Sequence, residues 1–270
     1  MIWTDANDDV RTAYLDLIRR DLTRYGEDEL VPVKSNFWRL LLGGFGLTLV
    51  RKRPFDRRKR ELGQDWPQNA ETMIGMRRLK SLQCCVETVL ADNVPGDLVE
   101  CGVWRGGASI LMRAVLKAYG DETRCVWLAD SFRGVPPPNT AKYQADEEVR
   151  LDLAADYLGV SQAEVAGNFD RYGLLDDRVR FVPGWFKDSL HDAPIDCISV
   201  LRLDGDLYES TIQALTALYP RLSSGGYCIV DDYHSVAACR QAVTDYRNEH
   251  GVSEEIIEID GSGVLWRRKE

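Results

Sequence analysis

The sequence predicts an α/β protein built on one mostly parallel sheet of seven strands. Short apolar runs alternate with longer amphipathic segments, which is typical of β–α units whose helices cover both faces of a parallel sheet. A glycine-rich turn at residues 102–107 follows the first of these runs. Two later runs end in acidic clusters, Leu203-Asp204-Gly205-Asp206 and Val230-Asp231-Asp232-Tyr233.

The individual elements follow in chain order. The predicted strands span residues 98–101, 126–129, 179–183, 197–203 and 227–230, and a terminal hairpin of residues 255–259 and 264–267 completes the seven. The hairpin adds an antiparallel strand to the parallel sheet. Helices are predicted at residues 69–93, 108–119, 211–222 and 236–249, with Ser235 as a candidate N-cap of the last helix.

We divide the chain into an N-terminal helical extension, residues 1–68, and a main domain, residues 69–270. The extension is predicted to contain a helix at residues 9–25, where apolar residues repeat at helical spacing. Residues 37–60 combine an apolar, glycine-rich stretch with a basic one. We favour a subunit contact for them over a lid or a peripheral membrane contact, and therefore expect a homo-oligomer. The prolines and charges of residues 136–162 indicate an inserted lid segment.

Composition excludes several classes of function. The formal net charge of −9 argues against a nucleic-acid partner, because phosphate binding requires a basic surface. No apolar run approaches the ~20 residues of a membrane span, and the acidic N-terminus lacks a signal-peptide pattern. The seven cysteines form no Cys-x-x-Cys pair and are interpreted as reduced, mostly buried thiols. We therefore expect a cytoplasmic protein.

The two acidic clusters indicate a cation site. If their strands are parallel neighbours, the strand ends lie about 5 Å apart, at the edge where open α/β sheets bind ligands. Carboxylates crowded in this way repel one another unless a cation lies among them, and an all-oxygen ligand set favours Mg²⁺, Mn²⁺ or Ca²⁺ over zinc. The alternative is a solvated loop with helix caps. His234 follows the second cluster directly, without a defined role.

The glycine-rich turn indicates a small-molecule cofactor. Its glycines lie between a strand and the N-terminus of a helix, whose free N–H groups favour an anionic group. The spacing is Glu-x-Gly-x-x-x-Gly rather than Gly-x-Gly-x-x-Gly, which disfavours NAD. Asp130 at the next strand end is suited to accept hydrogen bonds from ribose hydroxyls, or to cap the following element. Trp185 and Phe186 either stack on an adenine or fill the core.

These motifs together resemble those of class I S-adenosylmethionine-dependent methyltransferases. The match is with the macrocin O-methyltransferase family, which includes sugar O-methyltransferases of the mycinamicin and novobiocin pathways. The resemblance extends from about Glu61 to Arg267. It rests, in this order, on residues 71–75, 95–107, 171–177, 184–188, 203–208 and 231–233. Residues 30–60 match least well, and we transfer no role to them.

The resemblance implies a Rossmann-like class I methyltransferase fold and a metal-dependent O-methyltransferase. It implies that Asp204, Asp231 and Asp232 bind a divalent cation, foremost Mg²⁺, and that Asp206 is the general base. A cation lowers the pKa of a weakly acidic hydroxyl, and a nearby carboxylate accepts its proton. The implied contacts to S-adenosylmethionine are Met73, Ile74, Glu100, Gly102, Gly106, Ser109, Asp130, Ser131, Phe132, Trp185, Phe186 and Asp188.

The expected acceptor is a hydroxylated small molecule, foremost a deoxysugar on a natural product. Alternatives are a phenolic acceptor, as in catechol O-methyltransferases, and a non-catalytic cofactor-binding protein of the same fold. A dinucleotide oxidoreductase is disfavoured by the turn spacing and the terminal hairpin. The sequence does not identify the acceptor or the hydroxyl that is methylated.

Overall fold

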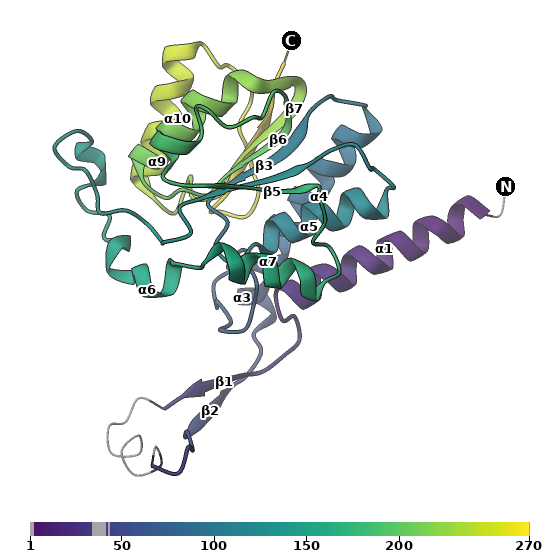
Figure 1. Ribbon diagram of the computed structural model, residues 1–270, viewed down its shortest axis with the longest axis vertical. Coiled ribbons are helices and arrows are strands. Elements are labelled where there is room, and N and C mark those ends of the chain that lie inside the picture. The colour runs from purple at the N-terminus through teal and green to yellow at the C-terminus, as the bar shows by residue number, and fades with distance from the viewer. Residues whose placement is uncertain (1–2, 34–41, 43, 270) are drawn as a thin grey trace.

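A seven-stranded sheet forms the centre of the computed structural model, which describes residues 3–33, 42 and 44–269 (Figure 1). The strand order is β5-β4-β3-β6-β7-β9-β8. The strands are β3 (Asp97–Cys101), β4 (Val126–Asp130), β5 (Val179–Pro183), β6 (Ile198–Leu203), β7 (Leu222–Val230), β8 (Ile257–Glu258) and β9 (Val264–Arg267). Strands β3 to β7 are parallel, whereas β9 lies antiparallel between β7 and β8. The predicted fold class is confirmed.

Helices cover both faces of this sheet because successive strand residues point to opposite sides. In β3, Leu98 packs among residues of α1, α4 and α5, whereas Val99 packs among residues of α9 and α10. The helices are α1 (Trp3–Leu22), α3 (Arg57–Leu62), α4 (Met76–Ala91), α5 (Gly107–Ala118), α6 (Ala155–Leu158), α7 (Gln162–Arg171), α8 (Phe186–Ser189), α9 (Tyr208–Leu218) and α10 (Ala237–His250).

Several element starts differ from the prediction. Helix α1 begins at Trp3 rather than at residue 9, and α9 begins at Tyr208 rather than at residue 211. Helix α4 begins at Met76 rather than at residue 69, because the preceding loop packs on α5, where the Gly107 N–H donates to the Glu71 carbonyl at 3.0 Å. Strand β7 begins five residues early, through the stretch at residues 223–226 whose two glycines resemble a turn. Ser235 does not cap α10; its hydroxyl contacts that of Ser262.

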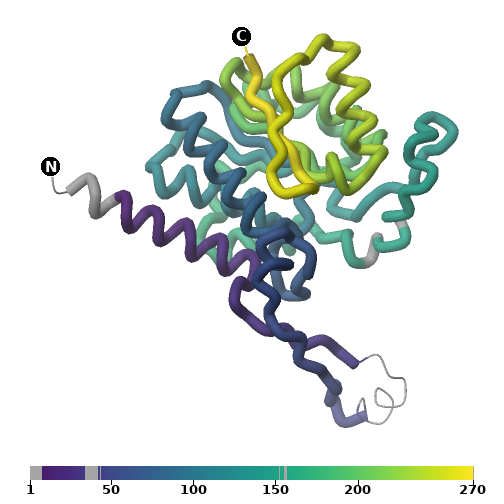
Figure 2. The backbone as a smooth tube through the Cα atoms, turned by 180° about the vertical axis from the view of Figure 1, so that it is seen from behind, coloured from purple at the N-terminus to yellow at the C-terminus, as the bar shows by residue number. Residues whose placement is uncertain are grey.

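The N-terminal extension contains a β-hairpin that the sequence analysis did not predict. Strands β1 (Glu29–Pro32) and β2 (Val50–Arg53) pair antiparallel and project away from the body in both views (Figure 1, Figure 2). Helix α1 packs against α4 and α5. Residues 37–41 and 43 of the proposed contact segment lie outside the described residues. No described helix is long and apolar enough to cross a membrane.

Candidate active site

The two acidic clusters meet at one edge of the sheet, because the strands that precede them are neighbours. Leu203 of β6 and Val230 of β7 are register partners. The Asp231 N–H donates to the Leu203 carbonyl at 2.9 Å, which places the second cluster beside the first. Carboxylate oxygens of Asp204, Asp231 and Asp232 consequently lie within 4.8 Å of one another.

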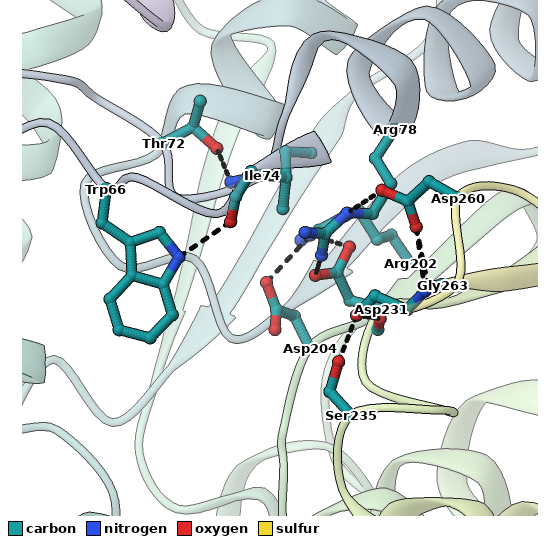
Figure 3. A network of polar contacts seen from close by, with 12 residues as sticks. Trp66, Thr72, Ile74, Arg78, Arg202, Asp204, Asp231, Ser235, Asp260 and Gly263 are labelled. Carbon is teal, nitrogen blue, oxygen red and sulfur yellow. Dashed lines mark hydrogen bonds and ion pairs between the residues drawn. The ribbon is translucent and has the colours of Figure 1, made fainter. Parts of the chain in front are cut away.

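Arg202 balances part of this negative charge from inside the sheet (Figure 3). The residue is 2% exposed. Its guanidinium donates to Glu100 Oε1 at 2.5 Å, to Asp204 Oδ2 at 2.9 Å and to Asp231 Oδ1 at 2.7 Å. A buried guanidinium is tolerated only with such partners, and here one cation joins three strand ends.

A second arginine approaches from a helix. Arg78, in the first turn of α4, forms an ion pair with Oδ2 of Asp231 and donates from Nε to Asp260 at 2.9 Å. Asp260 belongs to the turn between β8 and β9, and its other oxygen accepts from the Ser262 and Gly263 N–H groups, each at 3.1 Å. The terminal hairpin is thereby fixed to the acidic cluster.

The acidic residues differ in their affinity for protons. Burial, with the charges of Asp204 and Asp231, raises the pKa of Asp206 to about 7. Burial also raises the pKa of Asp232 well above its usual range. Burial alone would do the same to Asp231, but Arg202 and Arg78 hold the pKa of Asp231 below its ordinary value. The cluster therefore contains one carboxylate that two arginines keep ionised and two carboxyl groups whose protonated form is favoured by burial.

The glycine-rich turn lies in direct contact with the first acidic cluster. Gly102 has φ of 84°, and a Cβ there would lie 1.9 Å from the Asp204 carbonyl oxygen. Gly106 precedes α5 with φ of 87°, where a Cβ would lie 2.9 Å from Val165. Side chains at either position would require backbone movement, so the turn depends on glycine.

Asp130 is fixed by one backbone N–H group of this turn and one of the loop after β4. Its Oδ2 accepts from the Val103 N–H and its Oδ1 from the Phe132 N–H, both at 2.7 Å. Glu100, only 1% exposed, instead accepts from Ser109 and Arg202. Burial raises the pKa of Glu100 to about 7, although both of its partners oppose that shift.

Two adjoining cavities open at this edge of the sheet. The smaller, about 410 Å³, lies beside Asp130 and between Gly102 and Trp185. The larger, about 1120 Å³, is walled by residues 62–74, 144–158 and 260–262 among others. The residues that line both cavities are Met73, Trp104, Leu158, Asp204 and Asp206.

Residues 11–268 match the family model described as Macrocin-O-methyltransferase (TylF). The chain belongs to the macrocin O-methyltransferase family. It is therefore an O-methyltransferase of the S-adenosylmethionine-dependent class, as the resemblance implied.

Two relatives and one solved structure show how far the similarity extends. The 8-demethyl-8-(2,3-dimethoxy-alpha-L-rhamnosyl)-tetracenomycin-C 4'-O-methyltransferase of Streptomyces olivaceus is 53% identical over 96% of this chain and 94% of its own length. The mycinamicin III 3''-O-methyltransferase of Micromonospora griseorubida is 48% identical over 94% and 96%. The structure of the O-methyltransferase NovP has a TM-score of 0.86 at 45% identity and covers 96% of this chain and 100% of that chain.

The structure distributes the sequence-predicted cofactor residues over three places. Met73, Gly102, Asp130, Ser131, Trp185 and Phe186 line the smaller cavity. Ile74 and Glu100 line the larger one. Gly106, Ser109, Phe132 and Asp188 line neither cavity. The cofactor roles of all twelve residues stay predictions. His234 is exposed and also lies outside both cavities.

Sequence reasoning missed the arginines and one aromatic residue of the macrocin O-methyltransferase site. Arg202 interrupts an otherwise apolar strand, and that interruption was a readable signal. Arg78 carried no such signal, since it stands beside Arg77 and near Lys80 in a helix with several polar residues. Trp104 lies within the glycine-rich turn at φ of 46° and stacks obliquely on Tyr157, with ring centroids 5.7 Å apart. An aromatic residue inside such a turn indicated a cavity wall.

The residues present fit a divalent cation. The Oδ2 atom of Asp232 is buried and has no hydrogen-bond partner among the described residues. A cation would satisfy this atom, and an unpaired buried acceptor is costly. The oxygens of Asp231 that accept from arginine each keep a second lone pair. Carboxylate oxygens are the ligands that Mg²⁺ prefers.

Proposed function

We propose that this enzyme transfers a methyl group from S-adenosylmethionine to a hydroxyl of a deoxysugar that is carried by a natural product. The reaction would require a divalent cation, Mg²⁺. One observation carries the proposal: Asp204 and Asp206 line both cavities. A methyl donor in the smaller cavity and an acceptor in the larger one would meet beside these carboxylates. Holding two reactants in line accounts for much of the catalysis in such reactions.

We assign the smaller cavity to the methyl donor. Asp130 is positioned by two backbone N–H groups and keeps lone pairs for the ribose hydroxyls. Trp185 and Phe186 offer aromatic faces to an adenine on the same wall. The bound donor supplies an electrophilic methyl group, and Met73 would contact it where the two cavities join.

We assign the chemistry to the acidic residues. Asp204, Asp231 and Asp232 would hold the cation, which supplies Lewis acidity toward the acceptor oxygens. Asp206 accepts the proton of the hydroxyl. Its pKa of about 7 suits this role, because a general base works best when its pKa lies near the operating pH. Its φ of 57° indicates a strained backbone of the kind that functional sites retain.

The larger cavity supports a bulky glycosylated acceptor. Its volume, about 1120 Å³, exceeds what a monosaccharide fills. Trp66, 56% exposed, and Tyr157, 40% exposed, offer apolar faces at its wall. One relative is named for a tetracenomycin derivative that bears a rhamnosyl group, and another for mycinamicin III. A phenolic acceptor, as in catechol-type enzymes, is the second candidate, since a cation can also bind vicinal phenolic oxygens.

Calorimetry and turnover together test the proposal. We expect S-adenosylhomocysteine to bind both with Mg²⁺ and with EDTA, and turnover of glycosylated acceptors to require Mg²⁺. Full turnover in EDTA would contradict the cation-dependent part. Turnover of catechols but not of deoxysugar-bearing compounds would show that the acceptor is phenolic and not a deoxysugar. Absence of S-adenosylhomocysteine binding in both conditions would contradict the assignment of the smaller cavity.

We also propose that the N-terminal extension mediates self-association rather than contact with a lipid surface. The segment at and beside the projecting hairpin exposes Leu30, Phe45 and Leu47 by 63%, 80% and 59%. Large apolar side chains exposed in one short segment are typical of a contact surface. Light scattering should show an oligomer that Phe45→Ser with Leu47→Ser dissociates. Flotation of the protein with anionic liposomes, without self-association, would favour the membrane contact instead.

A further inference from the structure

Arg78 occupies an oxygen of a residue that we assign to the cation. Its guanidinium pairs with Oδ2 of Asp231, while Arg202 takes Oδ1. Both oxygens of one proposed ligand thus already accept from a resident cation. Arg202 also bridges Glu100 and Asp204 within the sheet, whereas Arg78 comes from α4 and touches the cluster only through Asp231.

A second carboxylate, that of Asp260, fixes the position of Arg78. Its Nε donates to Asp260 at 2.9 Å, and the Asp260 side chain is 0% exposed. Asp260 is in turn held by the N–H groups of Ser262 and Gly263. Arg78 itself is 9% exposed. The contacts therefore hold the guanidinium beside Asp231, largely shielded from solvent.

We propose that Arg78 is a resident counter-cation that competes with the divalent cation for Asp231 and weakens its binding. The inference rests on the proposed cation site. A fixed positive charge a few ångströms from a dication repels it strongly where water is excluded. A carboxylate that already accepts from a guanidinium also gives less electron density to a metal. More of the six oxygens that Mg²⁺ requires must then come from the acceptor and from water.

This role predicts an effect opposite to that of a structural residue. Loss of a structural contact would disorder Asp231 and weaken Mg²⁺ binding. Loss of a competing charge would instead strengthen Mg²⁺ binding. Arg78→Met removes the charge at similar length and leaves Asp260 with its two backbone donors, and Arg78→Lys keeps the charge. Arg113→Met is the matched control, because Arg113 is also buried and paired, with Asp176, but lines neither cavity.

The experiment is calorimetric titration of Mg²⁺ into each full-length protein saturated with S-adenosylhomocysteine. We expect Arg78→Met to bind Mg²⁺ about tenfold or more tightly than the wild type, and Arg78→Lys to stay within about threefold. Arg113→Met should match the wild type. If Arg78→Met does not fold, Arg78→Gln replaces it.

The outcomes separate this inference from the proposed function. Equal or weaker Mg²⁺ binding in Arg78→Met, beside measurable binding in the wild type, overturns the inference and leaves the cation site standing. Absence of binding in every variant overturns both. Binding that appears only when the charge is removed supports the competition directly.

Discussion

Two sets of carboxylates lie along the same sheet edge, and the protein satisfies them to different degrees. Asp130, the last residue of β4, has both oxygens paired with fixed backbone N–H groups at 2.7 Å. Asp232, after β7, keeps a buried oxygen without a partner among the described residues. A site whose acceptors are already paired is preformed, whereas one with an unpaired acceptor is completed by what binds there. On the proposed assignment, the donor side is preformed and the acceptor side is completed on binding.

The largest expected effect separates chemistry from donor binding. Asp206→Asn removes the proposed base, and kcat should fall by about 100- to 10,000-fold. The dissociation constant of S-adenosylhomocysteine should stay within about twofold, because we assign the ribose contacts of the donor to Asp130 rather than to Asp206. Asp192→Asn, an exposed carboxylate, serves as the control. A large loss of donor affinity in Asp206→Asn would move Asp206 to the donor side.

Asp130→Asn tests the donor side. Replacement of a charged acceptor should weaken S-adenosylhomocysteine binding by about 10- to 100-fold in calorimetry. Asp97 is the matched control at the opposite end of the sheet, since it accepts from the Cys125 N–H and Trp127 Nε1. Asp97→Asn should lower Tm without changing donor affinity. Equal donor affinity in both variants would place the ribose elsewhere.

Glu100 should make stability depend on pH. Its pKa rises from 4.5 to about 7 on folding, so the folded protein keeps a proton that the unfolded chain has released. The contribution of this group to the free energy of unfolding therefore falls as pH rises from about 4.5 to about 7. In Glu100→Gln this decrease is absent, because glutamine does not titrate. In EDTA, the free energy of unfolding of the variant relative to that of the wild type should rise by roughly 1–3 kcal/mol between about pH 5 and pH 8. A difference in Tm that is constant with pH would show that Glu100 is ionised throughout.

The smallest expected effect concerns the acceptor wall. Trp66 has φ of 41°, so Asn is the suitable replacement, because Asn tolerates that backbone. Trp66→Asn should raise the KM for a glycosylated acceptor by about fivefold, with kcat and donor affinity unchanged. Tyr119→Asn, a partly exposed aromatic residue outside both cavities, is the comparison. An unchanged KM would remove Trp66 from the acceptor surface.

The sequence predicted the central sheet closely because its parallel strands appear as short, mainly apolar runs separated by longer helical segments. It did not predict the β1–β2 hairpin, since all four residues of β2 are exposed and no alternation marks them. The acidic residues were predictable because each cluster ends a strand. The Arg78–Asp231 pair was not, because it joins residues 153 positions apart through packing that no local pattern records.

The walls of the larger cavity have a consequence for how new products arise. Residues 144–158 and 260–262 belong to segments between strands, whereas the donor turn and the acidic clusters are anchored at strand ends. Loops accept insertion and exchange far better than strands do. Recombination of segment 144–158 between relatives is therefore expected to redirect methylation to other scaffolds while the transfer step persists. A family of enzymes with this architecture can therefore change which product is methylated while the catalytic residues stay the same.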